Sequence, residues 1–249
     1  MVQLKGLFKL TPSIAIKYFR NKKNINTWDW YELWQKAHRK SFTVAKVVND
    51  KVLTDIREAL DSALSEGKTF HEFQKELKPL LQKKGWWGEQ IVVDTNGVAE
   101  KVQLGSMYRL KTIYSVNMQT AYQTGRYETQ LENKEDRPYW QYVAVLDSNT
   151  RPEHAQLHDL VFPCDDAFWS AFYPPNGWRC RCRVRALSED NLKKRGLVVE
   201  KSAGKLSEEL RLVSKKSGEY KSVTVYTDPL TGKKLEPDVG WSYNPASEF

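Results

Sequence analysis

The chain has 249 residues, of which 40% are hydrophobic and 28% are charged, and its formal net charge is +8 at pH 7. This balance is typical of a folded soluble protein with a substantial core, and no apolar run approaches the roughly 20 residues that span a bilayer. The first residues read MVQLKGLFKLTPSIAIKYF and lack the apolar stretch and small-residue cleavage site of a signal peptide. We therefore expect neither a secreted nor a membrane-embedded protein.

Positive charge is concentrated at the start of the chain. Residues 1–40 contain nine Lys and Arg residues against two acids, a local excess of seven positive charges. Such a segment can contact a polyanion such as DNA or an acidic protein surface, and it can equally be a solvated face with a basic bias. The candidate DNA contacts in this segment are Lys17, Arg20, Lys22 and Lys23.

The first half of the chain predicts helices. Apolar residues at 31–64 recur at three- and four-residue steps, which is typical of an amphipathic helix, and the Ser-Glu-Gly at 65–67 ends it. Thr69 and Glu72 predict a capping box for a second helix, which we expect Pro79 to kink or end.

A loop or a small strand pair is expected next, at 86–99, where a short apolar run precedes an Asn-Gly turn signal. The pattern at 104–135 predicts a long helix. Gly125 inside this helix costs about 1 kcal/mol relative to alanine, which indicates close packing there.

The character of the sequence changes at Pro138. Residues 140–146 are rich in β-branched and aromatic side chains and predict a strand. The later expected elements are a helix at 153–157, a helical piece at 165–169, a turn at 174–177, a strand at 178–185, a helix at 207–212, a strand at 222–226 and a turn at 229–232. The predicted fold class is α+β. A helical, basic region at 1–137 precedes a compact mixed α/β domain with a small sheet and a C-terminal tail at 138–249.

The segment at 178–185, WRCRCRVR, alternates arginine with small apolar residues. In a strand its four arginines would share one face and its two cysteines the other. Exposed guanidinium groups can contact phosphates without sequence preference, and the candidates are Arg179, Arg183 and Arg185. Arg181 suits a buried bidentate clamp on a carboxylate, for which the candidates are Asp147, Asp165 and Asp166.

A structural zinc site is one interpretation of His154, Cys164, Cys180 and Cys182, because three thiolates and one imidazole complete a tetrahedral set. The single residue between Cys180 and Cys182 makes simultaneous ligation awkward in a strand, and it also disfavours a disulfide between them, so we expect a reducing compartment. The alternative is that these two cysteines are small buried hydrophobes and that His154 hydrogen-bonds to Asp147 or to a backbone carbonyl. Both interpretations stay open.

A zinc-dependent hydrolase or a deaminase-like enzyme is the alternative function for His154, Cys180 and Cys182. Zinc deaminases use a His-x-Glu pair and a Cys-x-x-Cys pair, whereas this chain has Glu153-His154 and Cys-x-Cys. A cysteine–histidine nucleophile is a further arrangement, but the pattern indicates no base near the thiols. We therefore expect no catalytic residues.

Several separated motifs resemble the Mu F-like minor head proteins of tailed bacteriophages, also called the head morphogenesis family. They are DSNTRPEH at 147–154, DDAFW at 165–169 and PPNGWRCRC at 174–182, and the ending GWSYNP at 240–245 is similar to the tail common in that family. The resemblance covers most of the chain. Its structural signature consists of Asp147, Arg151, His154, Asp166, Trp169, Pro175, Gly177 and Arg181.

This resemblance implies a minor capsid protein with a structural function in head morphogenesis, not a catalytic one. The implied location is the virion, in the capsid interior at the portal vertex, after assembly in the host cytoplasm. The resemblance implies that the helical region docks on the portal protein. Further implied partners are the scaffold protein, the major capsid protein and double-stranded DNA, which would be bound without sequence preference. No membrane is implied. Some members carry toxin domains after the core, and because this chain ends at Phe249 we expect the short, assembly-only form with no cofactor beyond the zinc considered above.

Overall fold

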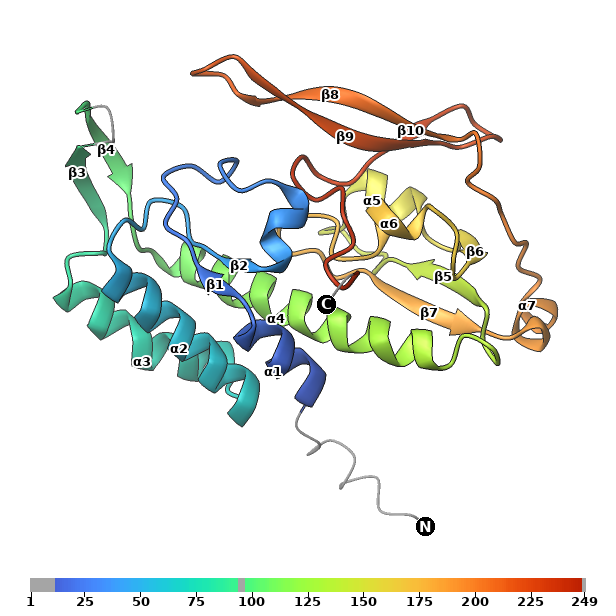
Figure 1. Cartoon of the computed structure of the whole chain (residues 1–249), viewed down its shortest axis with the longest axis horizontal. Helices are drawn as coiled ribbons and strands as arrows, with labels where there is room; N and C mark the ends of the chain where they lie inside the picture. The colour runs from blue at the N-terminus through green and yellow to red at the C-terminus, as the bar shows by residue number, and fades with distance from the viewer. Residues whose placement is uncertain (1–11, 94–96, 248–249) are drawn as a thin grey trace, which may run out of the picture. The chain divides into compact units, whose positions relative to one another are not determined.

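Long helices fill the first half of the chain and small sheets much of the second, which confirms the predicted α+β class (Figure 1). The computed structural model describes residues 12–93 and 97–247. The described chain divides into two compact units, one within residues 1–32 and 40–125 and one within residues 33–39 and 126–249. This division falls inside one helix, α4 (Met107–Glu132). The functional boundary that we expect at 137–138 stays a prediction.

Helix α2 (Asp50–Glu66), in the first unit, is capped at both ends by neighbouring residues. The Asn49 side chain accepts hydrogen bonds from the backbone N–H groups of Lys51 and Val52, and Gly67 ends the helix in the left-handed conformation with a φ of 71°. The apolar side chains at three- and four-residue steps are buried. The predicted stop at 65–67 is confirmed.

Helix α3 (Phe70–Lys83) has the predicted capping box. The Thr69 hydroxyl accepts from the Glu72 N–H, and the Glu72 carboxylate accepts from the Thr69 N–H. The helix passes through Pro79, so the expected end there was wrong. The leucines two residues before and after Pro79 are fully buried, and their burial outweighs the loss of one backbone hydrogen bond.

The segment before α2 is not the expected helix. Residues 31–49 contain the 3-10 helix η2 (Gln35–Arg39) and the strand β2 (Ser41–Phe42), which pairs in parallel with β1 (Lys23–Asn24). Lys46 adopts a φ of 62°, which no right-handed helix tolerates. The predicted helix was therefore wrong for residues 31–49.

The first unit also contains α1 (Ser13–Arg20) and the antiparallel hairpin of β3 (Glu89–Val93) and β4 (Ala99–Gln103) (Figure 1). Of the two alternatives for residues 86–99 the strand pair is correct, but its second strand begins only at Ala99. A Cβ on Gly125 of α4 would lie 3.8 Å from the Ala15 backbone nitrogen, so α1 packs on this part of α4 at ordinary van der Waals distance. Among the described helices, none is both long and apolar enough to cross a bilayer.

The second unit contains a three-stranded antiparallel sheet. Strand β5 (Tyr139–Val143) lies between β6 (Val161–Pro163) and β7 (Arg183–Leu187). The short helices of this unit are α5 (Pro152–Gln156), α6 (Trp169–Phe172) and α7 (Glu189–Arg195). The helical piece expected at 165–169 is a turn up to residue 168, because α6 begins only at the tryptophan.

Aromatic side chains form the core of the second unit. Trp140, Phe162, Phe168 and Phe172 are fully buried. The Phe168 ring stacks on those of Phe162 and Phe172, with centroids 4.1 and 4.4 Å apart. This packing holds the sheet and the helix α6 together.

A second antiparallel sheet is built on the long hairpin of β8 (Leu206–Ser214) and β9 (Glu219–Thr227), with β10 (Lys234–Leu235) at its edge (Figure 1). The helix expected at 207–212 was wrong, because these residues lie in β8. Their charged side chains find partners across the sheet: Glu208 accepts from the Thr224 hydroxyl at 2.6 Å. Such cross-strand pairs stabilise the extended chain. The strand expected at 222–226 is confirmed within β9.

Candidate functional site

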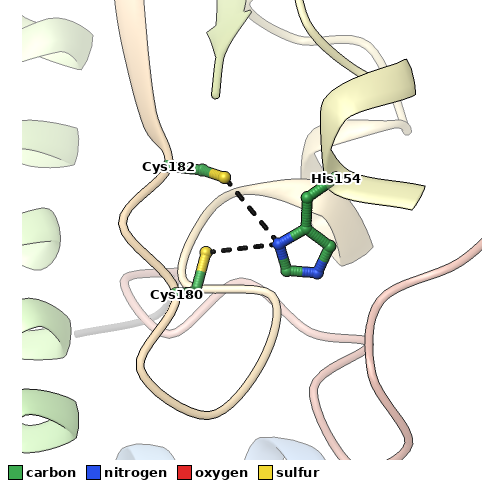
Figure 2. Close-up of side chains that lie close together, drawn as sticks. All are labelled: His154, Cys180 and Cys182. Atoms are coloured by element: carbon green, nitrogen blue, oxygen red, sulfur yellow. Dashed lines mark hydrogen bonds between the residues drawn. The ribbon is translucent and has the colours of Figure 1, made fainter. Parts of the chain in front are cut away.

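His154 lies on α5 and is buried, with 2% of its surface exposed. The helix starts with Pro152, whose fixed φ suits the first helical position. Nδ1 of His154 lies 3.7 Å from Cys180 Sγ and 3.8 Å from Cys182 Sγ, and the three side chains point toward one another (Figure 2). The structure therefore brings together three of the four candidate metal ligands.

The two cysteines reach the same nitrogen because the chain turns just before β7. This strand begins at Arg183, so the strand expected at 178–185 was wrong for residues 178–182. Arg179 adopts a φ of 57°, and the Cys180 N–H donates to the Gly177 carbonyl at 3.1 Å. The four arginines consequently do not share one face of a strand, while both cysteines remain buried.

Asp238, which was not among the predicted residues, contacts the opposite edge of the imidazole. Its Oδ1 lies 3.6 Å from His154 Nε2, and its Oδ2 lies 3.0 Å from Arg151 Nη2. The Asp238 N–H donates to the Asn176 carbonyl at 2.9 Å. A Cβ on Gly177 would lie 2.3 Å from Oδ2, so the close approach requires glycine. The only sequence signal for Asp238 is its place two residues before the GWSYNP tail.

The electrostatics of this cluster favour a thiolate beside an imidazolium. Burial lowers the pKa of His154, but the interactions with Asp238 and Cys182 outweigh it and raise the pKa to about 9. Interaction with the Cys180 thiol, helped by His154 and Tyr142, lowers the pKa of Cys182 to about 5 against the opposing effect of burial. The pKa of Cys180 is raised well above its usual range by its interaction with Cys182 and by burial. Cys182 is therefore the sulfur that carries the negative charge.

Arg181 pairs with Asp147, one of its three candidate partners. Nη1 donates to Oδ2 at 2.7 Å and Nη2 donates to Oδ1 at 2.5 Å, while Nη2 also donates to the Thr150 hydroxyl at 3.2 Å. The arginine is exposed, so the expectation of a buried clamp was wrong. Hydrogen bonding to Arg181 lowers the pKa of Asp147 to about 2. His154 faces the cysteines and Asp238, so Asp147, one of the two alternatives for its hydrogen-bond partner, was wrong.

Two further signature residues hold backbone groups in place. Asp166 accepts a hydrogen bond from the Ser202 N–H at 3.1 Å, and the Trp169 indole N–H donates to the Pro163 carbonyl at 2.9 Å. Pro175 is buried in the turn that leads to the cysteines. These residues hold turns of the second unit in place.

Cys164 lies outside the cluster. It follows β6 directly, is half-buried, and its N–H donates to the Pro138 carbonyl at 2.8 Å. The four-ligand set predicted for zinc is therefore not assembled. The buried donors that come together are the imidazole and two thiols.

The candidate DNA contacts of the first unit differ in exposure. Lys17 and Lys23 are exposed. The Arg20 side chain is engaged by Asp61, through hydrogen bonds of 2.7 and 2.8 Å. Lys22 is buried, and burial lowers its pKa to about 7, which leaves it poorly suited to a phosphate contact.

The candidate DNA contacts of the second unit are less exposed than expected. Arg179 is exposed, whereas Arg183 and Arg185 on β7 are half-buried. Arg185 Nη1 donates to the Gln141 side-chain oxygen at 3.4 Å. The expected exposure of Arg183 and Arg185 is found only in part, because these residues lie on β7, which pairs with β5.

Comparison with known proteins gives one family and two curated relatives. The model of the family "Phage Mu protein F like protein" matches residues 54–185, more than half of the chain. The chain is 50% identical over 248 residues to "Putative capsid assembly protein F" of Escherichia phage Mu, covering 99% of this chain and 56% of that protein. It is 44% identical over 223 residues to "Mu-like prophage FluMu F protein" of Haemophilus influenzae, covering 89% of this chain and 53% of that protein.

The chain thus spans about half the length of these curated relatives. No solved structure matches it. His154, Cys180 and Cys182 all lie inside the segment that the family model matches. The motifs, the α+β fold and these similarities together show that the chain belongs to the Phage Mu protein F-like family.

Proposed function

We propose that this protein is a structural component in the assembly of a phage head. The observation that carries the proposal is its 50% identity, over 99% of its length, to a protein named for capsid assembly. Burial of the cluster supports a structural over an enzymatic role. His154, Cys180 and Cys182 are at most 4% exposed, which denies a substrate direct access to them. Glu153, the proton shuttle of the deaminase alternative, lies at the exposed surface of α5 instead.

The finer proposal is that the first unit docks on the portal protein at the portal vertex inside the head, where scaffold and major capsid protein are its neighbours. Support comes from the β3–β4 hairpin, on which Ile91 and Val93 are 78% and 62% exposed. Large apolar side chains gathered on an exposed element are typical of a protein-binding surface.

Contact with packaged double-stranded DNA is part of the same proposal. Its support is the excess of positive charge over residues 1–40, with Lys17 and Lys23 at the surface of the described part. Arg179 is the exposed candidate of the second unit. Such contacts would bind phosphates without reading the base sequence.

Co-expression of the full chain with the portal, scaffold and major capsid proteins of its phage tests the assembly role. We expect sedimented heads to contain the chain, and immobilised portal protein to retain it with or without scaffold. The double variant Ile91→Asp, Val93→Asp should lose most of this retention. Leu230→Asp is the matched control, because Leu230 is also exposed but lies in the second unit. Heads and portal that both fail to retain the wild-type chain would contradict the proposal.

Binding to random double-stranded DNA across a salt series tests the DNA contact. Deletion of residues 1–40 is unsuitable, because Tyr18 and Phe19 belong to the core of the first unit. The double variant Lys17→Gln, Lys23→Gln keeps that core, and we expect its salt slope to fall by about 0.9 for each phosphate that is no longer neutralised. Lys75→Gln, exposed on α3, is the control. If the wild-type chain does not bind DNA at low salt, the DNA contact is contradicted and the basic segment contacts a protein partner instead.

A further inference from the structure

We propose that His154, Cys180 and Cys182 bind one thiophilic divalent transition metal ion, with zinc as the natural occupant. This site is independent of the role in head assembly, because it rests on three side chains within the second unit. Their candidate ligand atoms all lie within 4.8 Å of one another. Thiolate and imidazole are the donors that zinc prefers in proteins.

The distances from the imidazole nitrogen to the two sulfurs fit a tetrahedral zinc site. Zinc–sulfur bonds of about 2.3 Å and zinc–nitrogen bonds of about 2.0 Å place a sulfur and a nitrogen ligand about 3.6 Å apart at the tetrahedral angle. His154 Nδ1 lies 3.7 Å from Cys180 Sγ and 3.8 Å from Cys182 Sγ (Figure 2). Both nitrogen–sulfur distances are thus close to those of a tetrahedral zinc site.

The turn at 177–180 removes the geometric objection to a Cys-x-Cys pair. In a regular strand the two side chains would stand side by side and aim in parallel, away from a common point. Here the left-handed φ of Arg179 and the hydrogen bond from Cys180 to Gly177 curl the chain before β7 begins. Both sulfurs consequently converge on one imidazole nitrogen (Figure 2).

The surroundings of His154 match the second layer of a metal site. Metal-binding histidines usually hold their other ring nitrogen against a carboxylate, which fixes the orientation of the ring. His154 Nε2 faces Asp238, and Asp238 is held by Arg151 and by its backbone hydrogen bond to Asn176. Nδ1 is thereby left directed at the two sulfurs.

Charge balance also favours a divalent cation. Binding of a zinc ion would release the protons of the Cys180 thiol and the imidazole, and the ion would neutralise the two thiolates that result. The Asp238 carboxylate is already offset by the Arg151 guanidinium. Three protein ligands leave one tetrahedral position for a water molecule. The ion would join α5 to the turn before β7, so its role is to hold these loops together.

Metal content of the purified full chain tests the site, with Cys164→Ser as the matched control because this cysteine lies outside the cluster. We expect about one zinc ion per chain in the wild type and in Cys164→Ser, and loss of most of it in Cys180→Ser and Cys182→Ser. Cobalt added in place of zinc should give the thiolate-to-metal absorption band of a tetrahedral site in the wild type and in Cys164→Ser, and not in Cys180→Ser or Cys182→Ser.

Asp238→Asn provides a variant that keeps all three ligands. Loss of a second-layer carboxylate typically weakens metal affinity by about 10- to 100-fold, and we expect a decrease in this range from competition with a chromophoric chelator. Near-ultraviolet circular dichroism shows whether the cysteine variants fold. If they do not, Asp238→Asn still tests the metal site. The proposal is overturned if wild type and Cys164→Ser take up neither zinc nor cobalt, or if cobalt bound to them shows no thiolate band. In either case the cysteines are packing residues only.

Discussion

The two compact units are stabilised in different ways. Aliphatic side chains such as Leu53 and Leu60 are fully buried in the first unit, on helices whose ends are set by local caps. The second unit surrounds aromatic rings with buried polar contacts between distant residues, such as Tyr142 with Asn176 and His154 with the two cysteines. Local sequence patterns can specify the capped helices of the first unit, whereas the buried polar contacts of the second unit depend on the identity of individual residues.

This difference explains where the family motifs lie. The quoted segments at 147–154, 165–169, 174–182 and 240–245 all belong to the second unit. Their polar groups hold backbone groups in place, as the Asp166 carboxylate and the Trp169 indole N–H do. The motifs therefore contribute to the framework of the second unit.

The largest effect is expected from Phe168→Ala. This ring stacks on two others in the core of the second unit, so its loss should destabilise the protein by about 3–5 kcal/mol. Leu60→Ala, in the first unit, should cost about 2–5 kcal/mol. Denaturant unfolding gives both values, and hydrogen exchange shows which unit loosens. If both variants lose the same hydrogen-exchange protection in α2, the two units are not stabilised separately.

Removing one buried hydroxyl should have a smaller effect. Tyr142 donates to the Asn176 side-chain oxygen at 2.9 Å, and both residues are buried. Tyr142→Phe leaves that oxygen without its donor and should cost about 1–3 kcal/mol in thermal or denaturant unfolding. The control is Tyr220→Phe at an exposed position of β9, and a cost no greater than that of the control would argue against the polar framework.

The helix cap of the first unit should contribute less still. Thr69→Ala removes the capping box of α3 and should cost about 1 kcal/mol, while Thr69→Ser keeps the hydroxyl and most of the stability. The free energy of unfolding from urea titrations measures both. Equal destabilisation by the two substitutions would mean that packing of the threonine methyl group, not capping, stabilises the start of α3.

The exposed clamp between Arg181 and Asp147 should have the smallest effect on stability. Because folding lowers the pKa of Asp147, the pair stabilises the fold above the ordinary aspartate pKa of about 3.9 and loses this contribution as the pH falls through about 2. In Arg181→Gln the pKa of Asp147 should rise toward its ordinary value, as measured by NMR titration of the carboxyl group. Arg179→Gln should leave it unchanged, and an unaltered pKa in Arg181→Gln would show that the clamp does not form in solution.

Much of the fold could be predicted wherever a local signal sets it. The stop at 65–67, the capping box at Thr69 and the long helix at 104–135 each follow from neighbouring residues. The helix expected at residues 207–212 is part of strand β8 instead. Contacts across the sheet, such as the hydrogen bond from Thr224 to Glu208, stabilise this segment as a strand, and these contacts cannot be seen in the local sequence.

The candidate site could be predicted only in part. Residue types alone indicated His154, Cys180 and Cys182 as donors, and they equally indicated Cys164, which the fold places elsewhere. Asp238 could not be found, because nothing local connects a carboxylate near the end of the chain with α5. The turn that brings the sulfurs together was also hidden, since Arg179 is not a residue typical of a positive φ.

Hydrogen exchange of the full chain with and without a zinc chelator tests most directly whether a metal ion at the His154 cluster organises the second unit. We expect the chelator to speed exchange in α5 and in residues 174–187, and to leave α2 and α3 of the first unit unchanged. Unchanged exchange throughout the second unit, or an equal increase in α2 and α3, would contradict this account.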